Sequence, residues 1–314
     1  MTNKEIYKEI CPDYPVPVFA QTWWLDIVCP NWEVVLTKKG DRYTGCWAYP
    51  LESKMNVSII RTPRLTPYLG PVVFFPHDLK ESNRDSFEHE TITELFAQIP
   101  PAQVWHLALQ PRLRQAGLFS NFQFDLNVRQ TFITDLTKET ETLFANLKDS
   151  LRKNNRQAET EFYIVDNTEH LSRLFEFQSI TLAKKNKSQY YSLEDMRRLL
   201  DGCTRHHSGK LWSAIGKDDG KLHAVVFQVW DKECSYYLAG AQSPESNSHK
   251  AMSLLLWHSM KYAKELGIPK FDFEGSMDPG VERFFRGFGG EKALYMVLSR
   301  NNSLVWKLKQ LIFR

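Results

Sequence analysis

The chain has 314 residues, of which 42% are hydrophobic and 25% are charged. This length favours two domains of roughly 150 residues each over one large core, and the composition excludes a disordered chain. The net charge of +3, from 40 basic and 37 acidic side chains, excludes the strongly basic character of a dedicated nucleic-acid-binding protein.

The cysteines and the N-terminus bear on the compartment. The five cysteines are scattered, without a Cys-x-x-Cys pair or a histidine at zinc-binding spacing, so we expect reduced thiols and predict no metal. No segment approaches the roughly 20 apolar residues that cross a bilayer, and the N-terminus lacks a basic start followed by an apolar run. We therefore expect a cytoplasmic protein without a transmembrane segment.

The first half of the chain predicts a mostly β domain. Residues 1–30 are expected to form a capping segment, because the prolines of PDYPVPVF interrupt a helix. A hairpin is predicted around Lys39-Gly40-Asp41, and NVSIIRT and GPVVFF extend the sheet. Apolar residues at near-helical spacing from Ser86 to Ile99 predict a helix that Pro100-Pro101 ends, and QVWHLALQ returns to strand.

A second unit is predicted from Thr134, and it opens with an amphipathic helix. The apolar stripe of this helix consists of Leu143, Phe144, Leu147 and Leu151. Four basic residues gather towards its end: Lys148, Arg152, Lys153 and Arg156. A phosphate site is one interpretation of them. We favour a solvated face whose charges complement the helix dipole.

Helices around 171–182 and 193–200 follow, and then an antiparallel meander of LWSAIG, LHAVVFQVW and CSYYLAGA. The polar loop QSPESNSHK leads into a long helix that Gly267 and Pro269 end. A strand, KALYMVLSR, and a terminal amphipathic helix are predicted at the end of the chain. The order of elements in the two halves is related, so we expect two similar domains, 1–133 and 134–314.

The segment KFDFEGSMDPGVERFFRGFGG contains the most informative side chains. As a strand, KFDFEGS places Phe271 and Phe273 on one face and projects Asp272 and Glu274 side by side from the other, and Gly275 permits a sharp turn. In open α/β sheets, ligands sit at the carboxyl ends of the strands. The two carboxylates are therefore candidates for a functional site.

A helix is predicted directly after this strand, with Asp278 as its N-cap and Pro279 as its first residue, ending at Gly289-Gly290. The helical spacing assigns most of its apolar residues to the core: Val281, Phe284, Phe285 and Phe288. Glu282 and Arg286 are four residues apart, which on spacing alone favours an ordinary exposed ion pair.

FDFEGSMDPGVERFFRGFGG, preceded by YYLAGA and LLLWHSMKYAKELGI, resembles the closing segment of the FemABX-type aminoacyltransferases, which contain two GNAT-like domains. The positions that match the family's pattern are Asp272, Phe273, Gly275, Gly280, Phe285, Arg286, Phe288 and Gly289. Arg286 replaces the usual lysine, which keeps the charge and changes the geometry. TFITDLTKETETLFANLKDSLRKNNRQAE and TPYLGPVVF resemble, more weakly, segments of the family's second and first domains.

The resemblance implies an α/β (α+β) fold of tandem GNAT-like domains, with mixed central sheets flanked by helices. It also implies an acyltransferase that acts on the amino group of a small molecule or peptide, such as a peptidoglycan precursor. Acyl-CoA and aminoacyl-tRNA both stay open as donors. The family's tRNA-contacting helical hairpin has no counterpart here, and QSPESNSHKAM keeps Gln242 without the glycines of the GNAT pyrophosphate loop.

Transfer to an amine requires a base and a group that stabilises the oxyanion. The candidate catalytic residues are Glu274 or Asp272 as the base and Arg286 for the oxyanion or the donor phosphates. Tyr236 or Tyr237 would donate to the leaving group. The expected substrate-binding residues are Tyr237, Gly275, Phe285, Ser246 and Ser248, the two serines acting with Asn247 at the start of the long helix. The alternative is a non-catalytic GNAT-like scaffold that binds a peptide, an acyl carrier or a partner protein.

Overall fold

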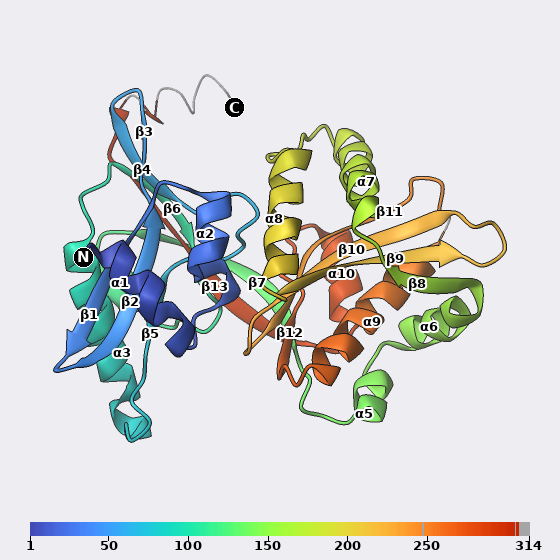
Figure 1. The fold of residues 1–314 in the computed structure, drawn as a ribbon, viewed down its shortest axis with the longest axis horizontal. Helices are drawn as coiled ribbons and strands as arrows, with labels where there is room; N and C mark the ends of the chain where they lie inside the picture. Colours follow the sequence, from blue (N-terminus) through green and yellow to red (C-terminus); the bar gives the residue numbers. More distant parts are fainter. Residues whose placement is uncertain (247, 305, 308–314) are drawn as a thin grey trace. The chain divides into compact units, whose positions relative to one another are not determined.

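The computed structural model describes residues 1–246, 248–304 and 306–307. The chain divides into two compact units (Figure 1), one formed by Met1–Arg129 with the chain from Leu294 on, the other by Gln130–Ala293. The predicted boundary after residue 133 falls inside β7 (Asp125–Asp135). The end of the chain differs from the predicted domain 134–314, because β13 (Glu291–Asn301) pairs with β6 (Val104–Ala108) inside the first unit.

The first unit begins with short helices, which are α1 (Asn3–Ile10), η1 (Cys11–Asp13), η2 (Val18–Ala20) and α2 (Thr22–Val28). A three-stranded antiparallel sheet follows, made of β1 (Trp32–Lys39), β2 (Arg42–Pro50) and β5 (Pro71–Val73). The predicted hairpin is confirmed: β1 pairs with β2, and Gly40 has the positive φ of +61° that its turn requires.

The remaining strands of the first unit are β3 (Glu52–Lys54), β4 (Val57–Arg61), β6 and β13, in that order across the sheet. Two further helices belong to this unit, the 18-residue α3 (Glu81–Gln98) and the 6-residue α4 (Ala116–Asn121). The predicted helix from Ser86 therefore starts five residues earlier, at Glu81. Tryptophan and phenylalanine rings fill the core of this unit, among them Trp32, Trp47, Trp105 and Phe119.

The sheet of the second unit has the strand order β7-β12-β11-β10-β9-β8. The strands not yet described are β8 (Phe162–Asp166), β9 (Gly209–Gly216), β10 (Leu222–Trp230), β11 (Ser235–Gln242) and β12 (Lys270–Asp272). The antiparallel meander β9-β10-β11 is confirmed. β12 joins β11 in parallel and β7 antiparallel, so the sheet is mixed, as predicted.

Helices cover both faces of this sheet (Figure 1). One face carries α6 (Asp149–Glu161) and α9 (Lys250–Glu265), which pack on each other, and the other carries α7 (Leu171–Ala183) and α8 (Leu193–Arg205). Strand alternation explains this arrangement, because Ala224 and Val226 of β10 belong to the apolar cluster beneath α9. Val225, which lies between them on the opposite face of β10, is buried as well, as expected for a central strand.

The single helix predicted at the start of the second unit is wrong: the structure has two helices, α5 (Thr140–Ala145) and α6. The break is held by hydrogen bonds. The Lys148 N–H donates to the Gly287 carbonyl at 2.8 Å. Arg152 Nη1 donates to the carbonyls of Ala145 and Leu147 at 2.6 and 2.7 Å, which satisfies the end of α5. The residues of the predicted apolar stripe do pack into one buried cluster, although they are spread over α5, α6 and the connection between them.

α10 (Pro279–Arg286) begins as predicted, because the Asp278 carboxylate accepts the N–H groups of Gly280 and Val281. The helix ends at Arg286, earlier than the predicted Gly289-Gly290, with Gly287 as its C-cap. Most of the predicted terminal helix lies outside the described residues. Within the described part of the chain, no helix has both the length and the apolar content needed to cross a membrane.

Candidate functional site

The turn after β12 differs from the predicted strand. β12 ends at Asp272, and both Glu274 (φ +57°) and Gly275 (φ +63°) adopt the left-handed conformation. The prediction that Asp272 and Glu274 project side by side from one strand face is therefore wrong. At Gly275 a Cβ would overlap the Gln130 carbonyl oxygen, so only glycine fits. At Glu274 the conformation costs about 1–2 kcal/mol, a strain typical of functional sites.

Asp272 is the buried support of this turn. It is 1% exposed, and its Oδ1 accepts the Thr131 hydroxyl at 2.5 Å and the Glu274 N–H at 2.7 Å. Thr131 lies on β7, so the carboxylate links the central sheet to the turn. These contacts fit a structural role for Asp272 better than that of a base.

The Glu274 carboxyl differs from that of Asp272 in its hydrogen bonding. Its Oε1 is buried and has no hydrogen-bond partner among the described residues. Burial raises the pKa of Glu274 well above its usual value, and the charge of Asp272 adds to this effect. Leaving a buried polar atom without a partner costs about 1–3 kcal/mol, so a hydrogen-bond donor brought to Oε1 would be stabilised there.

Three tyrosines lie within electrostatic reach of Glu274, and we call Tyr190, Tyr191 and Tyr237 the tyrosine cluster. Desolvation raises the pKa of each hydroxyl, although the Tyr190 side chain as a whole is 64% exposed, and the charge of Glu274 raises all three further. Tyr237 comes from β11. Tyr190 and Tyr191 come from residues 184–192 between α7 and α8, which we call the cover segment. The tyrosine cluster therefore comes from two elements, β11 and the cover segment.

The cover segment is held at both ends. The Tyr191 hydroxyl donates to Gln178 Oε1 of α7 at 2.8 Å, and Gln189 donates to the same oxygen at 3.2 Å. Lys185 forms an ion pair with Asp278, the N-cap of α10, with Nζ 2.6 Å from Oδ2. Tyr191 is 8% exposed, whereas Tyr190 is 64% exposed. Tyr190 therefore lies where a substrate entering from solvent would meet it.

The strands beside this group separate at the site. β11 and β12 pair only at Ser235 with Phe271 and at Tyr236 with Asp272, whereas β11 stays paired to β10 as far as Gln242. A bulge in β11 at Leu238 accompanies the separation. Tyr237 and Glu274 thus lie just past the residues that pair β11 with β12, Tyr237 within β11 and Glu274 beyond the carboxyl end of β12. The carboxyl ends of strands are where ligands bind in open α/β sheets.

Packing fixes the Tyr237 ring. It meets Phe285 of α10 with ring centroids 5.4 Å apart, and a Cβ at Gly240 would overlap its hydroxyl. Phe285 is 3% exposed and belongs to the core. Its predicted part in substrate binding is thus confined to supporting Tyr237. The Tyr236 hydroxyl donates to Asp231 at 3.3 Å, whereas Tyr237 is the one of these two tyrosines whose pKa the charge of Glu274 raises.

Arg286 is placed as its sequence spacing suggests. Its side chain is 58% exposed, and its Nη1 lies 3.8 Å from Glu282 Oε1. This is a long, solvent-exposed pair of the kind worth under about 1 kcal/mol. The structure thus brings Asp272, Glu274, Gly275 and Tyr237 together, and it gives Arg286 a surface partner.

The predicted serines lie in the loop before α9. Ser246 Oγ is 2.9 Å from His223 Nδ1, and the other ring nitrogen is 3.1 Å from Asp219 Oδ2. Ser246 therefore bonds to His223 rather than capping α9, contrary to the prediction. Ser248 is exposed, and Asn247 lies outside the described residues. In the described part of this loop, no side chain caps α9.

The sequence interpretation missed Thr131, Tyr190 and Tyr191. Thr131 lies 141 residues from its partner Asp272 along the chain. The adjacent tyrosines follow a helix in the polar stretch KKNKSQYYS, which has no periodicity to indicate burial. Two neighbouring aromatic residues in a polar connection are the one signal that points to them.

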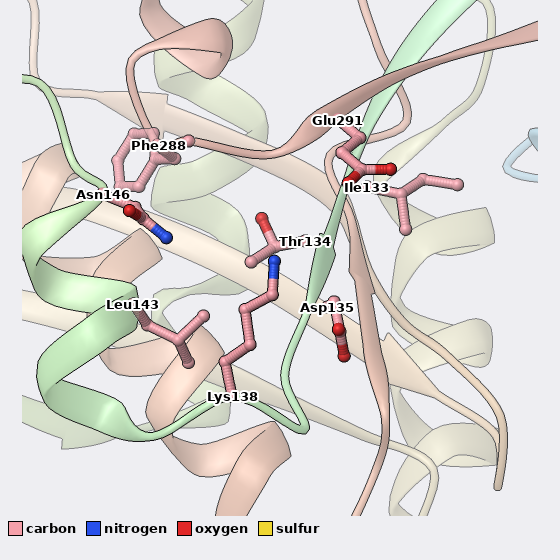
Figure 2. A pocket seen from close by; sticks show the side chains of 9 residues that line it. Ile133, Thr134, Asp135, Lys138, Leu143, Asn146, Phe288 and Glu291 are labelled. Atoms are coloured by element: carbon pink, nitrogen blue, oxygen red, sulfur yellow. The ribbon is translucent and has the colours of Figure 1, made fainter.

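A small polar depression lies elsewhere in the second unit (Figure 2). Thr134, Asp135, Lys138, Asn146 and Glu291 line it, and Figure 2 shows the Lys138 side chain extending to Thr134. Neither Glu274 nor the tyrosine cluster lines it. The Asp135 carboxylate already accepts two bonds from Thr137. Of the two places, Glu274 is the better candidate for the functional site, because its buried Oε1 has no hydrogen-bond partner among the described residues.

Sequence comparison identifies one domain. Residues 143–286 match the family model described as an acetyltransferase (GNAT) domain. The matched residues include Glu274, the tyrosine cluster and the loop before α9. No curated protein matches the chain.

Solved structures match over nearly the whole chain. The crystal structure of FemX has a TM-score of 0.68 at 13% identity and covers 100% of this chain and 99% of its own. The C-terminal domain (DUF2156) of a putative lysylphosphatidylglycerol synthetase from Agrobacterium fabrum gives 0.53 at 12%, covering 99% and 95%. A tandem GNAT protein from the clavulanic acid biosynthesis pathway gives 0.52 at 10%, covering 94% and 92%. The predicted fold, α/β and FemX-like with tandem GNAT domains, is confirmed.

Proposed function

We propose that this protein is a GNAT-type acyltransferase that transfers an acyl or aminoacyl group to an amine, and that Glu274 takes the proton from that amine. The observation that carries the proposal is the buried Oε1 of the partly exposed Glu274, which has no hydrogen-bond partner among the described residues. An amine arriving as an ammonium ion would supply the missing partner. It would also bring a positive charge to a carboxylate that burial disfavours.

The reaction assigned to this site balances as follows. Glu274 removes a proton from the ammonium, and the free nitrogen attacks the acyl carbon of the donor. A C–N bond forms as the C–S bond of a thioester or the C–O bond of an aminoacyl ester breaks. As the amide forms, the amine's second proton passes to the leaving thiolate or alkoxide by way of the Tyr237 hydroxyl, which gives up its own proton and takes up that one. Glu274 releases the first proton to solvent. A base works best when its pKa lies near the working pH, which the raised pKa of Glu274 favours.

Tyr237 is the proposed donor of the proton to the leaving group. Burial and the nearby Glu274 raise the pKa of its hydroxyl, so that it remains O–H at neutral pH. Its position against Phe285 keeps the ring fixed beside the carboxyl. Tyr190 and Tyr191 would line the path of the acceptor.

Both acyl-CoA and aminoacyl-tRNA remain candidate donors, and the start of α9 is where a phosphate group of either would bind. α9 has 16 residues, and its first N–H groups have no side-chain cap in the described part of the loop. Such groups favour an anion. The glycines that would let phosphate approach the backbone are missing, and Ser246 is bonded to His223. The fit to a CoA pyrophosphate is therefore partial, resting on the helix alone.

The test is an acyl-transfer assay with a panel of primary amines that includes a peptidoglycan precursor peptide, using acyl-CoA in one arm and charged tRNA in the other. We expect transfer in one arm. We expect Glu274→Gln to lower kcat/KM by about 10²–10⁴-fold, the usual contribution of a general base.

The matched control is Glu282→Gln, which removes a carboxylate of the same segment that is paired with Arg286. It should keep turnover within threefold of wild type. Wild-type turnover in Glu274→Gln would contradict the proposal. Absence of transfer in both arms, with binding of either donor detected by thermal shift, would favour a non-catalytic scaffold.

A further inference from the structure

We infer that Asp272 is a positioning residue for Glu274: its buried carboxylate holds the left-handed turn that directs the Glu274 side chain towards the tyrosine cluster. This inference rests on the function proposed above for Glu274. The sequence predicted either Glu274 or Asp272 as the base, and this inference gives Asp272 a positioning role instead.

Three contacts with β7 and the turn fix this geometry. Asp272 Oδ1 accepts the Thr131 hydroxyl at 2.5 Å and the Glu274 N–H at 2.7 Å. Between them, the Phe273 N–H donates to the Phe132 carbonyl at 3.1 Å. Thr131 and Phe273 are both fully buried. The chain at 272–274 is thus tied to the central sheet by a side chain and by the backbone.

The direction of the Glu274 side chain depends on these ties. With a positive φ, Glu274 leaves the line of β12, whereas an extended residue 274 would continue the strand alternation. The next residue follows the same path, because Gly275 lies against the Gln130 carbonyl, where no side chain fits. Asp272 supplies the hydrogen bond to the N–H of the strained residue itself. Losing that bond frees Glu274 to return to extended backbone.

The charged and titratable groups around the pair are known from each neighbouring element. Glu274 interacts electrostatically with Asp272 of β12, with Tyr237 of β11, and with Tyr190 and Tyr191 of the cover segment. Asp272 interacts in the same way with the buried thiol of Cys234, directly before β11. Asp272 is 1% exposed, so an amine would reach Glu274 and not Asp272.

The experiment compares Asp272→Asn, Asp272→Ala and Thr131→Val. Asn keeps an oxygen acceptor for both donors and removes the charge, so we expect kcat within about fivefold of wild type and an acid limb of the pH profile at lower pH. Ala removes the acceptor, and we expect a fall in kcat of about 10²-fold with KM within threefold. Thr131→Val loosens Asp272 alone and should lower kcat by about tenfold.

Two measurements keep the test independent of folding and of activity. Asp231→Asn is the matched control: it alters another buried carboxylate of this unit, one that accepts the backbone N–H groups of Glu233 and Cys234. It should leave kcat and the pH profile unchanged. The Glu274 carboxyl is also observed directly by ¹³C NMR in protein labelled at glutamate, with its signal assigned by its loss in Glu274→Gln. Its titration should move to lower pH in Asp272→Asn.

The outcomes separate this inference from the proposed function. Unchanged kcat in Asp272→Ala, with activity lost in Glu274→Gln, would overturn the positioning role and leave the function intact. If no transfer is found, the NMR signal of Thr131→Val decides, because this variant keeps the Asp272 charge, whose removal alone would shift the Glu274 titration in Asp272→Ala. An unchanged Glu274 signal in Thr131→Val would overturn the inference, and a changed one would support it in the absence of activity.

Discussion

The turn at Glu274 and the loop before α9 both follow the carboxyl end of a strand in the same sheet. They differ in whether their polar side chains have hydrogen-bond partners. Ser246 of the loop bonds to His223 of β10, which bonds in turn to Asp219 of the connection between β9 and β10. In the turn at Glu274, Asp272 is hydrogen-bonded, and Glu274 Oε1 has no partner among the described residues. A group that already has its hydrogen bonds has less to gain from a ligand, so the comparison favours the turn as the site of the proposed chemistry.

The largest expected effect is that of Gly275→Ala. The new Cβ meets the Gln130 carbonyl, and the residue also takes a positive φ, so we expect a loss of about 3–5 kcal/mol or an insoluble protein. Gly220→Ala is the control, because Gly220 has nearly the same φ of +62° with nothing within 4 Å of its Cβ. It should lose only about 1 kcal/mol. Equal urea midpoints for the two variants would show that the turn is not tightly packed.

The next largest effect is expected for Glu274→Gln, which should increase the free energy of unfolding. The raised pKa of Glu274 means that the folded protein holds a proton that the unfolded chain, with a glutamate pKa of about 4.3, releases. Wild-type stability therefore falls as pH rises from that value through the folded pKa. We expect Glu274→Gln to be more stable by about 1–3 kcal/mol at pH 8, with the difference vanishing near pH 4.

The measurement is denaturant unfolding of both proteins at several pH values. A difference that is constant with pH would show that the carboxyl is not desolvated. Such a stabilising substitution at an active site is the expected sign of stability given up for function.

Removing the Ser246 hydrogen bond in the loop before α9 should affect stability and turnover less. Ser246→Ala removes one hydrogen bond to a partly exposed histidine, so we expect a loss of about 0.5–1.5 kcal/mol at most and turnover within tenfold of wild type. Urea unfolding and the transfer assay measure the two effects. A loss of turnover as large as that of Glu274→Gln would move the chemistry from the turn to the loop.

The smallest effect is expected at Arg286, which the family resemblance placed among the catalytic residues. Because its side chain is 58% exposed and its partner is 3.8 Å away, Arg286→Ala should change stability by less than about 0.5 kcal/mol and kcat/KM by less than threefold. The transfer assay under saturating and limiting donor measures this. A rise in KM for the donor alone would instead support the predicted contact with its phosphates.

Local signals in the sequence were enough for most elements. The hairpin at Gly40, the meander β9 to β11 and the N-cap at Asp278 all follow from short-range rules. The break between α5 and α6 did not, because it depends on Lys148 and Gly287, which are far apart in the chain. The Glu274 turn depends likewise on Thr131 and Gln130 of β7. Strand alternation identified the two carboxylates, and tertiary contacts separated their roles.

The return of β13 to the first unit has a consequence for biosynthesis. Val297–Asn301 covers the edge of β6, so the first unit, although its first part is translated first, is completed only after residues 297–301 have been translated. The second unit is one unbroken stretch, Gln130–Ala293, and is whole before that point. At about 5–20 residues per second, the uncovered edge of β6 waits many seconds for its partner strand. The nascent chain therefore matures from its middle outwards.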